Sequence, residues 1–495
     1  MEELVVYISE GVASDKHSKD SLGLLSSIHG SRQLAGFKQA DCPQHGAAIT
    51  GVGIGEKLLT ASPHRAIINV YSWGKETPDQ VMAVPEKMTC LAIAKHPSGA
   101  DKYKVPNFRT PWLLAGGTEK GRIYVWELAS GNLLCVKDAH YQAVSVLRFS
   151  RGGGFLVSGG RDARCVVWNI IDLVSVYNNG SNSDGMGFKA FASFADHVLP
   201  INDIIISEAG VLNDLRIYTA SNDGTLRIYD VMTQQLLTTF VLSHPVECIA
   251  EDPAKRACYV GLNNGTIRII HFYRVNKSTA VLENVIGCGK ISPVEHDPEL
   301  QDTFVHHQLQ QGANLARPSE TASVKRLALS LDGSCIISGD TAGRVYVSDV
   351  VTKQIIKSLT TLNAPISFIE VNIYPNALFK ESEEYSIKAD KRHRLIPPLK
   401  RILVSEDAMT HQLYMEIPGT ITEKPDFNQW LEAKAQEEME FKNLSEIDSE
   451  VKVAHTGLSN VSSDQDDKLA KVSKAYSELR DKYEQLYQEH IKNLN

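Results

Sequence analysis

Short β-rich runs recur seven times through the first 420 residues of this 495-residue chain. Trp126 and Trp168 end two such runs 42 residues apart, and Tyr229 and His271 are also 42 residues apart. A four-stranded repeat unit has a length of about 40–45 residues, so the longer spacings correspond to a unit plus an insertion. The runs are INVYSW (to Trp73), RIYVWE, RCVVWN, TLRIYD, TIRIIHF, RVYVSD (with Ser348) and HQLYMEI (with Tyr414).

The interior of each unit predicts strands joined by tight turns. Residues 140–169 give an inner strand, a Gly-rich turn, a second strand, a tight turn and a third strand. Seven such units predict an all-β, seven-bladed β-propeller, because closing the ring removes exposed strand edges. We expect LVVYISE (4–10) and RQLAGFKQ (32–39) to contribute one or two strands to the last blade, with the others from ISFIEVNI (366–373) and RILVSEDA (401–408).

Two units resemble the WD repeat, in which a His, a Ser or Thr, an Asp and a Trp form a buried hydrogen-bonded chain within one blade. The matching residues are His140, Ser158, Asp162 and Trp168 in one unit, and His197, Ser221 and Asp223 in the next, where Tyr229 replaces the Trp. The other units are degenerate, with Ala342 and Ser348 at two of these places. The resemblance implies a structural network and not a catalytic His–Asp pair.

Three insertions interrupt the units. Residues 177–187 are turn-rich, and residues 274–320 contain His296, His306 and His307 without a recognised metal spacing, which favours a partner-docking or disordered loop over zinc. The third, at about 375–400, holds a basic cluster that fits a solvated loop, a nuclear-import signal, or contact with RNA or an acidic protein. The cluster comprises Lys388, Lys391, Arg392, Arg394, Lys400 and Arg401, with Tyr385 and His393 nearby.

The composition changes near Pro425. From residue 423 onward there are 16 Asp+Glu against 10 Lys+Arg, whereas all eight cysteines lie earlier. We predict three regions: the propeller (1–422), an acidic, partly helical linker (423–467) and a coiled-coil helix (468–495). The helix carries apolar residues at alternating spacings of 3 and 4, which favours pairing with a second copy over packing onto the propeller. This seam consists of Leu469, Val472, Tyr476, Leu479, Tyr483 and Leu486, followed by His490.

No enzyme signature is apparent in the sequence. GVGIGEK (51–57) and GGTEKG (116–121) match neither nucleotide-binding pattern, and neither GxSxG nor HExxH occurs. The scattered cysteines include no CxxC pair, which argues against zinc and indicates buried free thiols. We therefore predict a protein that is not an enzyme and has no catalytic residues, metal or cofactor.

Charge and hydropathy narrow the class of partner. The net charge of −8 makes a generic basic coat for nucleic acid improbable, and no apolar run is long enough for a membrane span. The N-terminus shows no secretory signal.

Nearly the whole chain resembles one family, the WD-repeat subunit of the nuclear pre-ribosomal complex that matures the large ribosomal subunit. The most distinctive segment is ELASGNLLCVKDAHYQAVSVLRFS (127–150), supported by INVYSWG, DHVLPINDI and SNDGTLRIYD. The resemblance implies a non-catalytic scaffold in the nucleolus and nucleoplasm that supports removal of internal transcribed spacer 2.

Implied partners are a helical-repeat scaffold protein, a third subunit, the large pre-ribosome with its rRNA and, indirectly, the AAA ATPase midasin. The family's terminal helix is associated with self-association. The alternative function is a propeller that serves as a ubiquitin-ligase substrate receptor or as a trafficking coat subunit.

Overall fold

A computed structural model places the chain in two compact units, Met1–Pro418 and Gly419–Asn495. In the second unit, the structure describes only residues 434–436, 439, 474 and 482, which are helical and exposed. In the first unit, the described residues are 2–11, 21–30, 33–50, 56–73, 75–94, 113–151, 153–174, 190–208, 215–275, 281–294, 302–309, 322–374 and 396–403.

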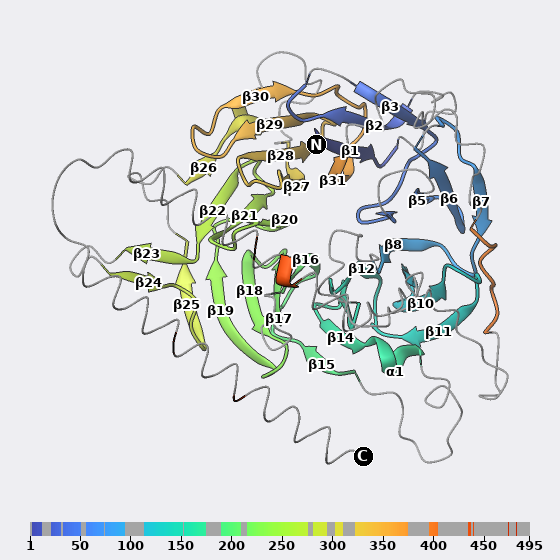
Figure 1. Ribbon diagram of the computed structural model, residues 1–495, viewed down its shortest axis with the longest axis horizontal. Coiled ribbons are helices and arrows are strands. Elements are labelled where there is room, and N and C mark those ends of the chain that lie inside the picture. Colours follow the sequence, from blue (N-terminus) through green and yellow to red (C-terminus); the bar gives the residue numbers. More distant parts are fainter. Residues whose placement is uncertain are drawn as a thin grey trace. The chain divides into compact units, whose positions relative to one another are not determined.

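The first unit is a seven-bladed β-propeller (Figure 1). Each blade is an antiparallel sheet whose strands follow one another from the channel outward. Blade 1 has β4 (Ala47–Ile49), β5 (Lys57–Ala61), β6 (Ile67–Ser72) and β7 (Gln80–Ala83). Blade 2 has β8 (Met88–Ile93), β9 (Leu113–Thr118), β10 (Arg122–Glu127) and β11 (Leu133–Asp138). Blade 3 has β12 (Val144–Phe149), β13 (Phe155–Gly160), β14 (Cys165–Asn169) and β15 (Ala192–Phe194), with helix α1 (Ile170–Val174) after β14.

The remaining blades complete the ring. Blade 4 has β16 (Ile201–Glu208), β17 (Leu215–Ser221), β18 (Thr225–Asp230) and β19 (Gln235–Val241). Blade 5 has β20 (Val246–Glu251), β21 (Ala257–Leu262), β22 (Ile267–His271) and β26 (Thr303–Phe304). Blade 6 has β27 (Val324–Leu329), β28 (Cys335–Asp340), β29 (Val345–Asp349) and β30 (Ile355–Ser358). Blade 7 has β31 (Ile366–Tyr374), β1 (Glu2–Ser9), β2 (Ser21–Ser27) and β3 (Gln33–Lys38).

In blades 2 to 6, the turns between the second and third strands use left-handed backbone. Gly224 and Gly265 have φ of 74° and 80° in blades 4 and 5, as their Asn/Asp-Gly sequences predict. Ala163 occupies the corresponding turn of blade 3 with φ of 64°. In blade 6 the turn requires Gly343, because a Cβ there would overlap the Leu362 carbonyl oxygen.

The ring closes where the two ends of the propeller meet in blade 7. β1 pairs along its whole length with β31 on one side and with β2 on the other. The N-terminus therefore supplies three strands, not the one or two that we expected, and the strand at Ser21–Ser27 was not anticipated.

One predicted strand of blade 7 was wrong. The described start of the run RILVSEDA, residues 401–403, lies at blade 2, where Leu403 forms a parallel bridge with Leu133, and the four described strands of blade 7 are β31, β1, β2 and β3. Residues 404–408, the run HQLYMEI and the insertion at 177–187 lie outside the described residues.

The apolar core consists of seven clusters, one in each seam between neighbouring blades. The seam between blades 7 and 1 contains Leu4, Val6 and Ile8 of β1, which are 0% exposed, against Leu58 and Tyr71 of blade 1. Because each blade buries both faces, the sheets support one another around the ring.

The long insertion after β22 is partly ordered and connects three blades. It forms a hairpin of β23 (Tyr273–Val275) and β24 (Leu282–Asn284), and then β25 (Lys290–Pro293), which adds to β19 of blade 4 in parallel. The chain next supplies β26, the outermost strand of blade 5, and helix α3 (His306–Leu309), from which His307 contacts blade 6. Within its described part, this insertion is a structural connection and not a disordered loop.

Candidate interaction surface

A buried hydrogen-bonded chain crosses blade 3. The Trp168 indole N–H donates to Ser158 Oγ (3.0 Å), and the Ser158 hydroxyl lies 2.9 Å from His140 Nε2. On the other side of the ring, His140 Nδ1 lies 3.0 Å from Asp162 Oδ1. The structure thus brings together the four residues that the WD-repeat resemblance groups in this unit.

Blade 4 has the same arrangement with one different residue. His197 Nδ1 lies 2.9 Å from Asp223 Oδ2, and His197 Nε2 lies 2.7 Å from the Thr219 hydroxyl. The structure therefore assigns the strand hydroxyl to Thr219 in place of Ser221, whose hydroxyl donates to the Leu199 carbonyl oxygen (2.9 Å). Thr219 precedes Asp223 by four positions, the same spacing as Ser158 and Asp162, and that spacing was the signal that could have identified it.

A third network in blade 6 was not predicted. His307 Nδ1 lies 3.0 Å from Asp340 Oδ2, and His307 Nε2 lies 2.8 Å from the Ser338 hydroxyl. The Arg344 Nε–H also donates to Asp340 Oδ2 (2.7 Å). Sequence reasoning missed this network because His307 comes from the long insertion, whereas His140 is four positions before its inner strand.

The three carboxylates are held in their ionised form. Burial alone would raise the pKa of Asp162, but the hydrogen bond and charge of His140 outweigh burial, so the pKa lies below its ordinary value. The pKa of Asp223 is lowered in the same way by His197 and Thr225, and that of Asp340 by His307 and Arg344. The groups satisfy one another inside the blades, which indicates a structural role.

These networks also fix exposed apolar residues on one face of the ring. Asp162 accepts a hydrogen bond from the Tyr141 backbone N–H (3.1 Å), and Asp223 accepts one from the Val198 backbone N–H (3.4 Å). Tyr141 is 82% exposed and Val198 is 80% exposed. We call Tyr141, Val198 and the half-exposed Leu199 the apolar loop patch; its members lie in the loops that enter blades 3 and 4.

The apolar loop patch has features of a protein-binding surface. The Arg164 guanidinium lies 4.9 Å from the Tyr141 ring centroid, which orients the ring and places a cation beside it. Tyr and Arg are the residue types that contribute most to binding at protein interfaces. Rigid blades carrying exposed apolar loops therefore favour binding over catalysis.

A charged cluster joins several blades across the channel. Asp203 of blade 4 lies 3.5 Å from His45 Nε2 and 3.6 Å from Arg326 Nη1 of blade 6. The Arg326 Nε–H donates to the Ser367 carbonyl oxygen of blade 7 (2.7 Å). Burial and the charges of Arg326 and Arg148 lower the pKa of His45 well below its ordinary value, so His45 is neutral. Through Arg326, the cluster links blade 4 to blades 6 and 7 across the ring.

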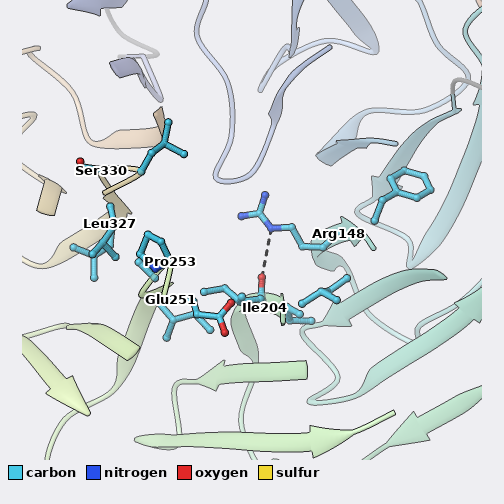
Figure 2. A pocket seen from close by; sticks show the side chains of 13 residues that line it. Arg148, Ile204, Glu251, Pro253, Leu327 and Ser330 are labelled. Atoms are coloured by element: carbon cyan, nitrogen blue, oxygen red, sulfur yellow. Dashed lines mark hydrogen bonds between the residues drawn. The ribbon is translucent and has the colours of Figure 1, made fainter. Parts of the chain in front are cut away.

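A hollow of about 370 Å³ opens beside this cluster, at the end of the channel where the inner strands finish. Figure 2 shows Arg148 reaching across it, with its Nε–H 3.4 Å from the Ile204 carbonyl oxygen. Leu327 and Pro253 line the side opposite Arg148. Glu251 also lines the hollow, and burial raises the pKa of its carboxyl. The lining lacks the paired nucleophile and base that a hydrolytic site requires.

Part of the basic cluster lies on the propeller. Lys400 and Arg401 are exposed, and the Lys400 backbone N–H donates to the Gly131 carbonyl oxygen of blade 2. Lys388, Lys391, Arg392 and Arg394 lie outside the described residues, as does the whole predicted coiled-coil seam.

Within the described ranges, no three His, Cys, Asp or Glu side chains are grouped to hold a metal ion. Cys288 is exposed and the other seven cysteines are buried; all eight are free. No helix among the described residues has the length and apolar character required to cross a bilayer.

Comparisons with known proteins agree with this geometry. The family description "WD domain, G-beta repeat" matches residues 131–169. The chain is 48% identical over 528 residues to Pre-rRNA-processing protein IPI3 of Scheffersomyces stipitis, covering 100% of this chain and 99% of the relative. It is 47% identical over 512 residues to the protein of that name from Candida albicans, again covering 100% and 99%. Pre-rRNA-processing protein crb3/ipi3 of Schizosaccharomyces pombe is 29% identical over 446 residues, covering 88% of this chain and 94% of the relative.

Proposed function

Because the chain belongs to the family of Pre-rRNA-processing protein IPI3, we propose that it is a non-catalytic scaffold subunit that acts in pre-rRNA processing. The observation that carries this proposal is the coverage: the identity to the Scheffersomyces and Candida relatives extends over the whole chain, propeller and tail together. The complex in which it acts is nuclear and supports removal of internal transcribed spacer 2 and late assembly of the large ribosomal subunit.

The propeller supports a scaffold role through rigidity. Its networks bury their polar groups within the blades, while Tyr141 and Val198 remain exposed on neighbouring loops. A fixed apolar surface loses little conformational entropy on binding, which favours affinity. We assign the helical-repeat partner of the complex to the apolar loop patch, because a helical-repeat surface offers the apolar grooves that Tyr and Val side chains fill.

The basic residues Lys388, Lys391, Arg392 and Arg394, together with exposed Lys400 and Arg401, have the chemistry to contact rRNA phosphates on the pre-ribosome. Midasin would then join through the assembled complex and the third subunit, not through a site on this chain alone.

The processing role is tested by shutting off expression of the chain in its host cells. We expect precursors that retain internal transcribed spacer 2 to accumulate, and mature large-subunit rRNA to fall, on hybridisation blots with spacer probes. Re-expression of the full chain restores the normal pattern. An unchanged pattern after depletion would remove pre-rRNA processing from consideration.

The partner surface is tested by Tyr141→Ser combined with Val198→Ser. Loss of these two apolar anchors should lower recovery of the helical-repeat partner at least tenfold in purifications of the tagged chain. Val351→Ser is the matched control, because Val351 is 83% exposed in a loop on the opposite face of the ring. Equal recovery with the double variant and the control would show that the patch is not the docking surface.

A further inference from the structure

The strongest unassigned feature is a groove along the outer edges of blades 1 and 2, occupied by the chain's own residues 396–400. We infer that this groove is a recognition site for an extended peptide containing two prolines followed by a leucine, and that its resident ligand is Ile396–Lys400. The segment, Ile-Pro-Pro-Leu-Lys, is the orange trace beside β7 and β11 in Figure 1. It joins the ring far from β31, where the preceding described strand ends in blade 7.

The groove captures the peptide backbone at both ends. The Gln80 side-chain amide of blade 1 bonds Ile396 twice, donating to its carbonyl oxygen and accepting from its N–H, both at 3.0 Å. At the other end, the Lys400 N–H donates to the Gly131 carbonyl oxygen (2.8 Å), and its carbonyl oxygen accepts from the Trp126 indole (2.9 Å). Four hydrogen bonds to main-chain atoms hold the segment extended, as in other peptide-binding grooves.

The donor at the far end is a WD-type tryptophan with a changed role. Trp126 pairs with Leu114 in blade 2 at the position where Trp168 pairs with Leu156 in blade 3. In blade 3, Ser158 follows Leu156 by two positions and its hydroxyl accepts the Trp168 indole N–H. In blade 2, the equivalent position is Gly116, which has no hydroxyl. The Trp126 N–H therefore has no partner inside its blade and donates to the peptide instead.

The groove also selects side chains. Leu399 is 6% exposed and packs in the seam between blades 1 and 2, with Met82 and Leu133 among its neighbours. Pro397 and Pro398 favour the extended backbone that both capture points require. At Gly131, φ is 72° and a Cβ would lie 2.5 Å from the Pro398 carbonyl oxygen, so only glycine allows this approach.

These contacts define the ligand chemistry as an extended apolar–Pro–Pro–Leu segment with a following residue held by its backbone. They do not depend on the function proposed above. The inference assigns an intramolecular docking role, in which the groove fixes residues 396–400 against blades 1 and 2.

The test uses the full-length chain and a fluorescent peptide with the sequence of residues 395–403. Leu399→Asp weakens the resident segment and exposes the groove, so we expect the peptide to bind this variant at least about tenfold more tightly than wild type, where the tethered segment competes. A peptide carrying Asp in place of its leucine should not bind. Adding Gln80→Ala to Leu399→Asp should weaken peptide binding about two- to tenfold, through loss of the clamp.

A second measurement stands independently of how Leu399→Asp folds. Lys400 and Arg401 are exposed trypsin sites, and the groove holds the backbone of Lys400, so Gln80→Ala alone should increase the rate of cleavage after them several-fold, as followed by mass spectrometry. Gln354→Ala, an exposed glutamine of the β29–β30 loop, is the control and should leave that rate unchanged.

The inference is overturned if folded Leu399→Asp binds the peptide no better than wild type, or binds both peptides equally. It is also overturned if Gln80→Ala and Gln354→Ala are cleaved after Lys400 and Arg401 at the same rate.

Discussion

The aspartate side chains Asp162, Asp223 and Asp340 of blades 3, 4 and 6 each bind a histidine, and the pKa of each carboxyl is lowered. The register of the second strand decides which hydroxyl completes each network. Thr219 and Ser221 lie on the same side of β17, because side chains alternate along a strand, so composition alone does not distinguish them. The number of positions that separate each of them from the turn aspartate Asp223 distinguishes them, and in the structure the Thr219 hydroxyl binds His197.

The aspartate networks predict a pH-dependent contribution to stability. Asp162→Asn removes an ionised acceptor from a buried site and should lower the free energy of unfolding by about 2 kcal/mol at neutral pH. Because the folded pKa of Asp162 lies below its unfolded value, this stabilisation is fully present above pH about 4 and is lost as pH falls through the folded pKa.

Denaturant unfolding of wild type and Asp162→Asn between pH 3 and 8 measures this difference. The difference in the free energy of unfolding between wild type and Asp162→Asn should decrease below pH about 4. Asp138→Asn is the control, because the Asp138 side chain is 81% exposed and should contribute little. A gap of constant size at every pH would mean that the Asp162 charge does not stabilise the blade.

Among the strands, the alternating and β-branched runs predicted most of those in the blades, because many of these runs are bounded by Gly, Asn or Asp turns. The closure of the ring was harder to predict. SLGLLSS (21–27) forms β2 although Ser and Gly dilute its pattern, whereas Leu403, in the apolar run after Lys400, bridges to blade 2. Local pattern does not specify which distant edge a strand meets.

The position of β1 between β2 and β31 predicts that a single buried charge there destabilises the whole ring. Val6 is 0% exposed, so Val6→Asp should lower the free energy of unfolding by more than about 3 kcal/mol. Thermal unfolding followed by circular dichroism measures the loss, with Val351→Asp as the exposed control. Similar melting temperatures for the two variants would contradict closure of the ring through β1.

For the whole molecule, the sequence predicts a role for the C-terminal tail that is separate from that of the propeller. The heptad from Leu469 to Leu486 predicts that two copies pair through their C-terminal helices. Deleting residues 465–495 should convert a dimer into a monomer in light scattering, while the β-rich circular dichroism remains. An unchanged mass after the deletion would refute the coiled coil.

A scaffold that acts in pre-rRNA processing remains bound to its partners and to precursor rRNA, so a purification distinguishes it from the alternative functions. The tagged full-length chain is recovered from nuclear extract at moderate salt, and the bound proteins and RNAs are identified together. We expect the bound material to contain large-subunit ribosomal proteins, the helical-repeat partner and precursor rRNA with internal transcribed spacer 2. Recovery of cullin adaptors or vesicle-coat proteins, without precursor rRNA, would contradict it.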